Sequence, residues 1–295
     1  MKILVSGASG MVGSALCDVL KSQNNIVVRL TRGKAEAGEV FWDPMAGKLD
    51  PDALAGVEAV VHLAGENIAG RWTDAKKKAI RESRILGTKT LCDALLKLKV
   101  APNVFISASA IGFYGNRGDE LLTESSPPGS GFLPDVCREW EAASDPLERV
   151  GIRTVRLRFG VILSRKGGAL AKMLTPFKLG VGGVIGSGKQ YMSWITLDDV
   201  IGVIEFALNN ATLAGPVNTV ARNAITNHDF TKTLGKVLNR PTFLPMPAFA
   251  ARLVFGEMAN DLLLGSTRVK PERLTASGYV YKHPELEDAL KAAIG

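Results

Sequence analysis

The sequence predicts an α/β fold in which a doubly wound parallel sheet precedes a smaller C-terminal α/β lobe. Short β-branched runs alternate with helical stretches through the first 165 residues, as in a parallel sheet with helices on both faces. A glycine-rich turn directly follows the first of these runs, and glycine-rich loops become frequent after residue 165. We therefore expect a sheet domain over 1–165 and a smaller substrate lobe over 166–295.

The expected elements follow one another along the chain. The strands are short apolar runs at Ile3 to Ser6, Ile26 to Leu30, Ala59 to Leu63, Val104 to Ser107 and Thr154 to Leu163. Helices are expected between them at 11–22 and 73–99, with Thr73 as a cap and Gly87 as a weak point. A segment near 215–222 is a candidate to complete the sheet, and the end of the chain, 243–295, is expected to be helical.

Composition excludes several classes of protein. Hydrophobic residues make up 46% of the chain and charged residues 22%, which indicates a globular protein with a sizeable core. No apolar run approaches the roughly 18 residues of a membrane span, and the opening stretch is too short for a secretory signal. Three widely spaced cysteines and three histidines favour neither disulfides nor a metal site. We expect a cytoplasmic protein, or one of an organelle stroma or matrix if a transit peptide was removed.

The net charge of +7 is concentrated in one segment. Residues 71–99 contain nine Lys or Arg and three Asp or Glu. Such a surplus suits a phosphate-rich ligand or an acidic partner, whereas the simpler interpretation is a solvated helix surface. We favour the helix surface for Lys76, Lys77 and Lys78, because no aromatic residues interleave with them as single-strand binding would require, and we expect no nucleic-acid partner.

A dinucleotide site is predicted at the start of the chain. The turn Gly7-Ala8-Ser9-Gly10-Met11-Val12-Gly13 joins the first strand to an apolar helix. Glycines in such a turn let the backbone approach a pyrophosphate, and the free N–H groups of the helix N-terminus favour its charge. A purely structural glycine turn is the alternative.

The second strand discriminates between NAD and NADP. An NAD enzyme places an acid about twenty residues after the turn to hold the ribose hydroxyls, whereas an NADP enzyme offers a hydroxyl and a cation. Here the strand ends in Thr31-Arg32, and no acid lies in the strand or between it and Glu36. NADP(H) is therefore the predicted cofactor. Further along, Leu63-Ala64-Gly65 forms a small-residue loop where adenine or ribose would pack, and we interpret His62 as a core histidine.

These residues resemble the short-chain dehydrogenase/reductase superfamily in its extended, epimerase-like form, with a Rossmann-type fold. The shared features are the glycine turn, Leu63-Ala64-Gly65, Ser107-Ala108-Ser109 before Tyr114-Gly115, and the run from Gly182 to Ile195. The last run, with Ala64 to Ile68 and Trp140-Glu141, resembles an atypical subfamily known as nucleoside-diphosphate-sugar epimerase or cell-division-inhibitor-like. That subfamily carries a C-terminal domain of unknown function, which residues from about Phe243 would match.

The resemblance implies a set of cofactor contacts. They are Gly10 to Val12, Thr31-Arg32, Leu63-Ala64, Arg84 and Val161. Arg84 is also plausible by itself, since a cation beside the carboxyl edge of the sheet could meet a cofactor phosphate.

The resemblance also exposes a missing proton relay. Superfamily members use a Ser or Thr with Tyr-x-x-x-Lys, whose tyrosine acts as acid or base during hydride transfer. None of the four tyrosines here has a lysine at the fourth position, and the equivalent places hold Leu133 and Cys137. Ser109 is retained as a candidate catalytic residue, and Tyr114 could donate a proton or simply pack on the cofactor. Cys137 is interpreted as a buried helix residue rather than an acid or redox thiol.

Two functions fit this pattern. The first is an NADP(H)-dependent oxidoreductase or epimerase acting on a small molecule, and the second is a cofactor-binding regulator of weak or no activity, linked by the family label to cell division. Glu66, Asn67, Gln190 and Trp194 are the expected substrate-lining residues, although Trp194 could instead close the core between the lobes. A homodimer through the 73–99 helix would match the superfamily's usual interface.

Overall fold

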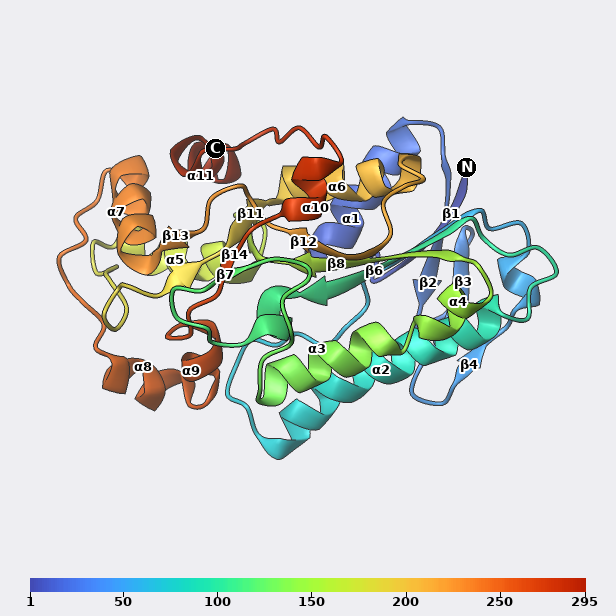
Figure 1. The fold of residues 1–295 in the computed structure, drawn as a ribbon, viewed down its shortest axis with the longest axis horizontal. Coiled ribbons are helices and arrows are strands. Elements are labelled where there is room, and N and C mark those ends of the chain that lie inside the picture. Colours follow the sequence, from blue (N-terminus) through green and yellow to red (C-terminus); the bar gives the residue numbers. More distant parts are fainter.

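The computed structural model describes residues 1–295 and contains one sheet of eight strands (Figure 1). The strand order is β12-β8-β6-β5-β1-β2-β3-β4, and every neighbouring pair is parallel except β3 and β4. The strands are β1 Lys2–Ser6, β2 Ile26–Thr31, β3 Glu39–Asp43, β4 Lys48–Leu49, β5 Ala59–His62, β6 Val104–Ala110, β8 Arg153–Phe159 and β12 Gly215–Thr219. The order reverses between β1 and β5, so the expected doubly wound, Rossmann-type sheet is confirmed, with its ligand crevice at the carboxyl ends of these two strands.

Helices cover both faces of the sheet, and the side chains of each strand alternate between them. In β1, Ile3 and Val5 join the core under α1 (Met11–Ser22) and α6 (Leu197–Asn209), whereas Leu4 joins the opposite core. The opposite face carries α2 (Asp74–Leu95), α3 (Phe132–Ala142) and α4 (Asp145–Arg149); α2 and α3 run along the lower part of Figure 1.

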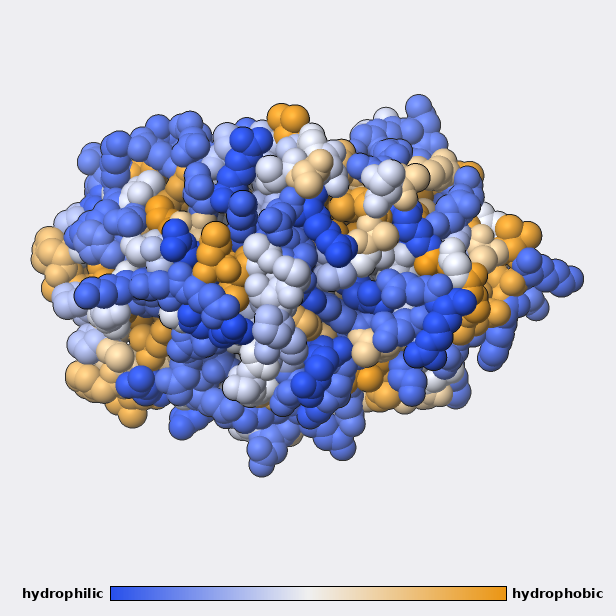
Figure 2. All heavy atoms as spheres, viewed as in Figure 1, coloured by the Kyte–Doolittle hydropathy of each residue, from blue (hydrophilic) through white to orange (hydrophobic).

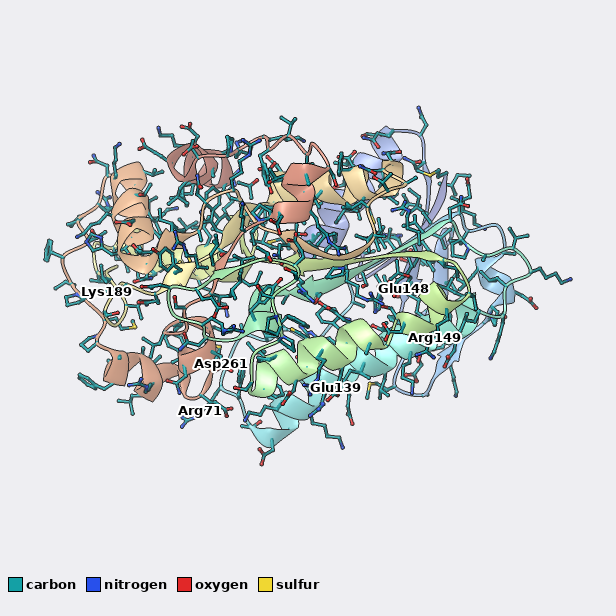
Figure 3. The ribbon with its side chains drawn as sticks, viewed as in Figure 1. Arg71, Glu139, Glu148, Arg149, Lys189 and Asp261 are labelled. Atoms are coloured by element: carbon teal, nitrogen blue, oxygen red, sulfur yellow. The ribbon has the colours of Figure 1, made fainter.

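The long helix α2 is continuous. Its first turn is capped by Thr73, whose side-chain oxygen accepts a hydrogen bond from the N–H of Lys76. Gly87 does not interrupt it, because the glycine lies in the buried part of the helix against Trp42 and His62. Arg81 of α2 pairs with Glu139 of α3, which is labelled in Figure 3 and ties the two helices together.

The smaller lobe is built from short strand pairs and helices. It contains β9 Val161–Leu163, α5 Gly168–Lys178, β10 Tyr191–Met192, β11 Trp194–Thr196, β13 Ile225–Thr226, α7 Asn227–Leu238, α8 Ala248–Phe255, α9 Met258–Leu262, β14 Arg268–Val269, α10 Glu272–Ala276 and α11 Leu286–Ile294. The remaining elements are η1 Asp52–Leu54, η2 Ile111–Tyr114 and β7 Leu121–Leu122. Three two-stranded pairs, β9 with β11, β10 with β13 and β7 with β14, organise it.

The two parts of the chain interlock rather than meet at residue 165. Both α6 and β12 come from the second half, yet α6 covers the sheet and β12 pairs with β8 along its whole length. In the other direction, β7 from the first half pairs with β14. The sheet is therefore completed by β12, within the segment 215–222 that was the candidate for this, whereas the cover provided by α6 lies beyond the expected boundary.

The α8–α9 segment bridges the lobes. Met258 and Phe255 pack with Trp72, Ile80 and Leu133 of the sheet domain. The outer side of α8 is different, because Phe249, Leu253 and Val254 are exposed, which contributes apolar surface at the lower left of Figure 2. No helix is long and apolar enough to cross a membrane.

Candidate functional site

The turn between β1 and α1 needs glycine at two positions. Gly7 has a φ of +68°, and a Cβ on it would come within 2.9 Å of the backbone of Leu63 and Ala64. A Cβ on Gly13 would overlap the carbonyl oxygen of Gly7. These two contacts bring the turn tightly against the loop after β5 and against its own helix, and leave Ser9 and Gly10 exposed.

The N-terminus of α1 has neither a side-chain cap nor a negative charge. Its cap residue, Gly10, makes no side-chain hydrogen bond to the first turn, and that turn contains no acid. By contrast, α2, α6 and α7 are each capped by a threonine hydroxyl and carry acids in their first turns. The backbone of Met11, Val12 and Gly13 therefore presents free N–H groups beside the crevice, an arrangement that suits an anion.

A directed chain of buried hydrogen bonds holds the loop that faces this turn. Ser6 Oγ accepts from the N–H groups of Leu63 and Ala64 and lies 2.6 Å from Nδ1 of His62. Nε2 of His62 lies 3.1 Å from Thr88 Oγ1, which donates to the carbonyl of Arg84. Ser6 Oγ already accepts from two N–H groups and must donate to Nδ1, and Thr88 gives its proton to Arg84 and must accept from Nε2, so the set closes only with neutral His62 protonated on Nε2. Burial lowers the pKa of His62 to about 4, so His62 is the core residue that was expected.

Arg84 lies directly beneath the Leu63-Ala64-Gly65 loop. Its Nη1 donates to the carbonyls of Glu66 and Ile80 at 3.0 Å, and its guanidinium stacks on Trp140 at 5.0 Å. A Cβ on Gly65 would lie 3.4 Å from the guanidinium carbon. Burial lowers the pKa of Arg84, opposed by the negative charge on Glu66. No carboxylate pairs with this largely buried cation, which leaves it able to meet an anionic ligand.

The other predicted cofactor residues also lie at this edge. Thr31 is the last residue of β2, and its hydroxyl accepts a hydrogen bond from Gly33. Arg32 follows it, and its exposed side chain has no hydrogen-bond or ion-pair partner. Asn67 is exposed, but its side chain accepts from the N–H of Ala69 and shapes the loop.

The two predicted catalytic hydroxyls are buried and already engaged. Ser109 is 2% exposed, and its Oγ donates to Glu141 at 2.6 Å. Tyr114 is fully buried, donates to Asn218 at 2.6 Å and accepts from Nη1 of Arg158 at 2.8 Å. Burial raises the pKa of Tyr114 despite the positive charge of Arg158. This geometry differs from the expected proton donors that face a substrate, and instead makes both residues members of a network centred on Arg158.

Leu133 and Cys137, which occupy the places where the resemblance predicts the relay, are buried and packed. Leu133 and Cys137 lie on one side of α3 and face Gly112 of η2, with the Cys137 sulfur 3.7 Å from where a Cβ on Gly112 would lie. Burial raises the pKa of the Cys137 thiol to about 12. Neither residue can move a proton at neutral pH, and the thiol is the buried residue that was expected.

Three further predicted site residues are structural in this geometry. Val161 is half-buried in β9, opposite Trp194 of β11. The side-chain nitrogen of Gln190 donates to the carbonyls of Ile185 and Leu263, which fastens the glycine-rich loop. Trp194 is 2% exposed in the lobe core. Gln190 and Trp194 therefore differ from the expected substrate lining, and Trp194 matches the alternative of a core residue.

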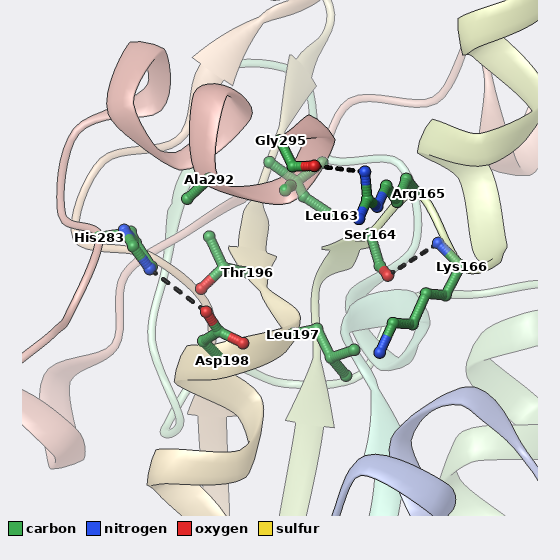
Figure 4. A pocket seen from close by; sticks show the side chains of 11 residues that line it. Leu163, Ser164, Arg165, Lys166, Thr196, Leu197, Asp198, His283, Ala292 and Gly295 are labelled. Atoms are coloured by element: carbon green, nitrogen blue, oxygen red, sulfur yellow. Dashed lines mark hydrogen bonds and ion pairs between the residues drawn. The ribbon is translucent and has the colours of Figure 1, made fainter.

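A cavity of about 170 Å³ lies next to β9 (Figure 4) and was not anticipated from sequence. Ser164, Lys166, Asp198 and His283 are among its lining residues. In Figure 4 the Lys166 side chain runs downward and ends near Leu197. The next residue, Gly167, packs against Met11 at the start of α1, so this loop borders the open helix end.

Comparisons with known proteins cover the whole chain. The model of the NAD dependent epimerase/dehydratase family matches residues 3–220, and a domain of unknown function, DUF1731, matches residues 246–293. Epimerase family protein Mb2239 of Mycobacterium bovis is 41% identical over 98% of this chain and 96% of its own. The chloroplastic SDR39U1 homolog of Arabidopsis thaliana is 36% identical over 99% of this chain and 86% of its own.

A solved structure is similar over the same extent. The crystal structure of human epimerase family protein SDR39U1 with NADPH aligns with a TM-score of 0.89 and 34% identity, over 99% of each chain. The expected family resemblance, including the C-terminal domain of unknown function, is confirmed by these matches.

Proposed function

Because this chain belongs to the NAD-dependent epimerase/dehydratase family, we propose that it binds NADP(H) and acts as an epimerase-like oxidoreductase on a small-molecule substrate. The observation that supports this most directly is the uncapped N-terminus of α1 at the β1–α1 turn, together with Arg32 and Arg84, neither of which has an ion-pair partner. The human relative SDR39U1, crystallised with NADPH, supports the same cofactor.

The residues at this edge fit a dinucleotide. Gly7 and Gly13 allow a close approach of backbone that a Cβ would prevent. Free N–H groups of Met11 to Gly13 would hold the pyrophosphate, and Leu63 and Ala64 would pack on the adenosine. Thr31 and Arg32 would contact the 2′-phosphate, and no acid lies at the end of β2 to compete with it.

In the proposed reaction the cofactor supplies the hydride and the solvent supplies the proton. NADPH, when bound, supplies a hydride to an electrophilic carbon of the substrate. The oxygen of a reduced carbonyl also needs a proton. Ser109 and Tyr114 are buried with their hydrogens committed to Glu141 and Asn218, so we assign this proton to water. The chain's own part is to bind and orient the cofactor and to position the substrate beside it.

A two-stage measurement tests this function. Calorimetric titration with NADPH and NADH should give saturable binding with NADPH preferred. Nicotinamide absorbance, followed with a panel of aldehydes, ketones and sugar nucleotides, should then report turnover. The variant Ser109→Ala should retain that turnover if water is the proton source. Absence of NADPH binding would refute the proposal at its first stage.

A regulator is the second candidate, and the buried relay positions favour it. Leu133 and Cys137 offer no acid or base, and the neighbouring hydroxyls are engaged. A cofactor-responsive regulator, with the division link that the family label suggests, would bind NADPH tightly and be stabilised by it. It would show no turnover across the same panel, which separates the two candidates.

The oligomeric state and the cellular compartment are also proposals. We propose a homodimer through the outer face of α2, and sedimentation velocity at low and high salt tests it, since the positive charge of 71–99 opposes close approach at low salt. We propose a cytoplasmic or stromal location, in line with the chloroplastic relative in Arabidopsis. Fractionation of the native host would check this.

A further inference from the structure

We propose that Lys76 is a specificity-determining residue that, together with Arg32, recognises the 2′-phosphate of NADP(H). This inference rests on the proposed cofactor and deepens it, because it adds a second cation from another part of the chain. Sequence alone favours a solvated helix surface for Lys76, in common with Lys77 and Lys78. The structure separates the three lysines.

The three lysines point to different partners. The Nζ atom of Lys76 lies 2.5 Å from Oε1 of Glu66, and its side chain is 24% exposed. Lys77 pairs instead with Glu257 of the C-terminal lobe, and Lys78 is 73% exposed. Of the three, only Lys76 is therefore held against the loop that follows β5, which is the loop expected to cover the adenosine.

That loop is fixed to α2 at two further points. The N–H of Glu66 donates to Ser83 Oγ at 3.0 Å, and Nη1 of Arg84 donates to the carbonyl of Glu66 at 3.0 Å. These bonds fix the backbone of Glu66, and its carboxylate holds Lys76 through their ion pair. A lysine held in place loses less conformational freedom on meeting a phosphate than a free one does.

The charges around Glu66 do not balance. The hydrogen bond from Lys76 is the largest effect and lowers the pKa of the Glu66 carboxyl; burial opposes it, and the charges of Lys76, Arg32 and Arg84 lower the pKa as well. Lys76 is bonded to this carboxylate, and the charges of Arg32 and Arg84 act on it as well, so positive charge exceeds negative charge at this loop. A phosphate monoester, with about 1.5 to 2 negative charges at neutral pH, would offset such an excess.

The same arrangement explains the role of Glu66. It is expected to line the substrate site, but in this geometry its carboxylate is occupied by Lys76. We assign it to holding the ammonium group near Arg32 until a phosphate shares that charge. A cofactor without the phosphate, NADH, gains nothing from Lys76.

Calorimetric titration of NADPH and NADH against the full-length protein tests the assignment. Lys76→Gln should weaken NADPH binding roughly tenfold, the size of one charge-assisted contact, and leave NADH binding unchanged. Lys76→Arg should restore most of the NADPH affinity. Lys78→Gln, which removes the same charge from an exposed position on the same helix, should change neither affinity.

The outcomes distinguish this inference from the proposed function. If wild-type protein binds NADPH but Lys76→Gln leaves its affinity unchanged, or weakens NADH equally, the assignment of Lys76 is wrong and the cofactor proposal stands. If wild-type protein binds neither cofactor, both are wrong. Thermal unfolding of each variant without ligand checks that the fold is retained.

Discussion

Arg158 and Glu141 form a buried, bidentate ion pair: Nε and Nη2 of the arginine each lie 2.8 Å from a different carboxylate oxygen. The side chains are only 4% and 12% exposed. The arginine also stacks on Phe113 at 3.5 Å and donates to Tyr114. Through this pair the network also engages the two hydroxyls predicted to be catalytic, because Ser109 donates to Glu141 and Tyr114 accepts from Arg158.

Breaking this pair should be costly. Arg158→Met leaves the Glu141 carboxylate buried without its cation, and removal of one partner from such a pair costs about 3–5 kcal/mol. We expect a loss of that size in the free energy of unfolding, measured in urea. The double variant Arg158→Met, Glu141→Met should lose less than the single one, because no charge is stranded. A loss below about 1 kcal/mol in the single variant would mean that the pair is open to solvent.

Acid should weaken the protein through His62. Its pKa is about 4 in the folded protein against 6.5 ordinarily, so between these pH values the unfolded chain binds a proton that the folded one does not. The stabilising effect is therefore complete above pH 6.5 and is lost as the pH falls toward 4, by about 3 kcal/mol in total.

The measurement for His62 is urea unfolding across that pH range, in wild type and His62→Gln. The variant should be less stable near neutral pH, because the chain from Ser6 to Thr88 is broken, and its stability should fall less steeply with acid. Parallel pH profiles would show that other groups account for the acid sensitivity.

Two glycine-to-alanine changes should have opposite effects. In Gly13→Ala the new methyl group overlaps the Gly7 carbonyl, so we expect a destabilisation of about 1–3 kcal/mol from overpacking and a loss of NADPH affinity. In Gly87→Ala, inside α2, the nearest atoms lie 3.7–3.9 Å away, which is ordinary contact. This control should gain up to about 1 kcal/mol from helix propensity. Denaturation and cofactor titration of both variants check the pair.

The cysteines should be unreactive in the folded state. Burial raises the pKa values of Cys92 and Cys137 to about 12, and raises that of Cys17 as well. Since the thiolate is the reactive form, a thiol reagent should label all three only after denaturation. Labelling of Cys137 within minutes under native conditions would instead support the redox role that the sequence left open.

The sheet was predictable where its strands are buried on both faces. The runs at β1, β5 and β6 are continuous apolar segments, and their bounds agree with expectation to within a few residues. β3 was missed because it lies near the sheet edge and mixes exposed Phe41 with charged Glu39 and Asp43, which gives no clear alternation.

The cofactor edge was predictable for a similar reason, since turn chemistry is local in sequence. The buried polar network was not. Arg158 looks like any polar residue in a strand, and its partners Glu141 and Tyr114 lie 17 and 44 residues away. Nothing near Ser109 in sequence indicates that Glu141 will occupy its hydroxyl. Such pairings could not be predicted from sequence, because they form only when α3 packs against the sheet.

The contact between α9 and the sheet domain has a consequence for the matched segment of unknown function, 246–293. Met258 covers Trp72 and Leu133, so a chain cut before residue 246 would present a bare aromatic surface to its surroundings. We expect such a fragment to be captured by chaperones or to precipitate. The segment completes an apolar cluster of the sheet domain, so we expect neither part to be stable as an isolated domain.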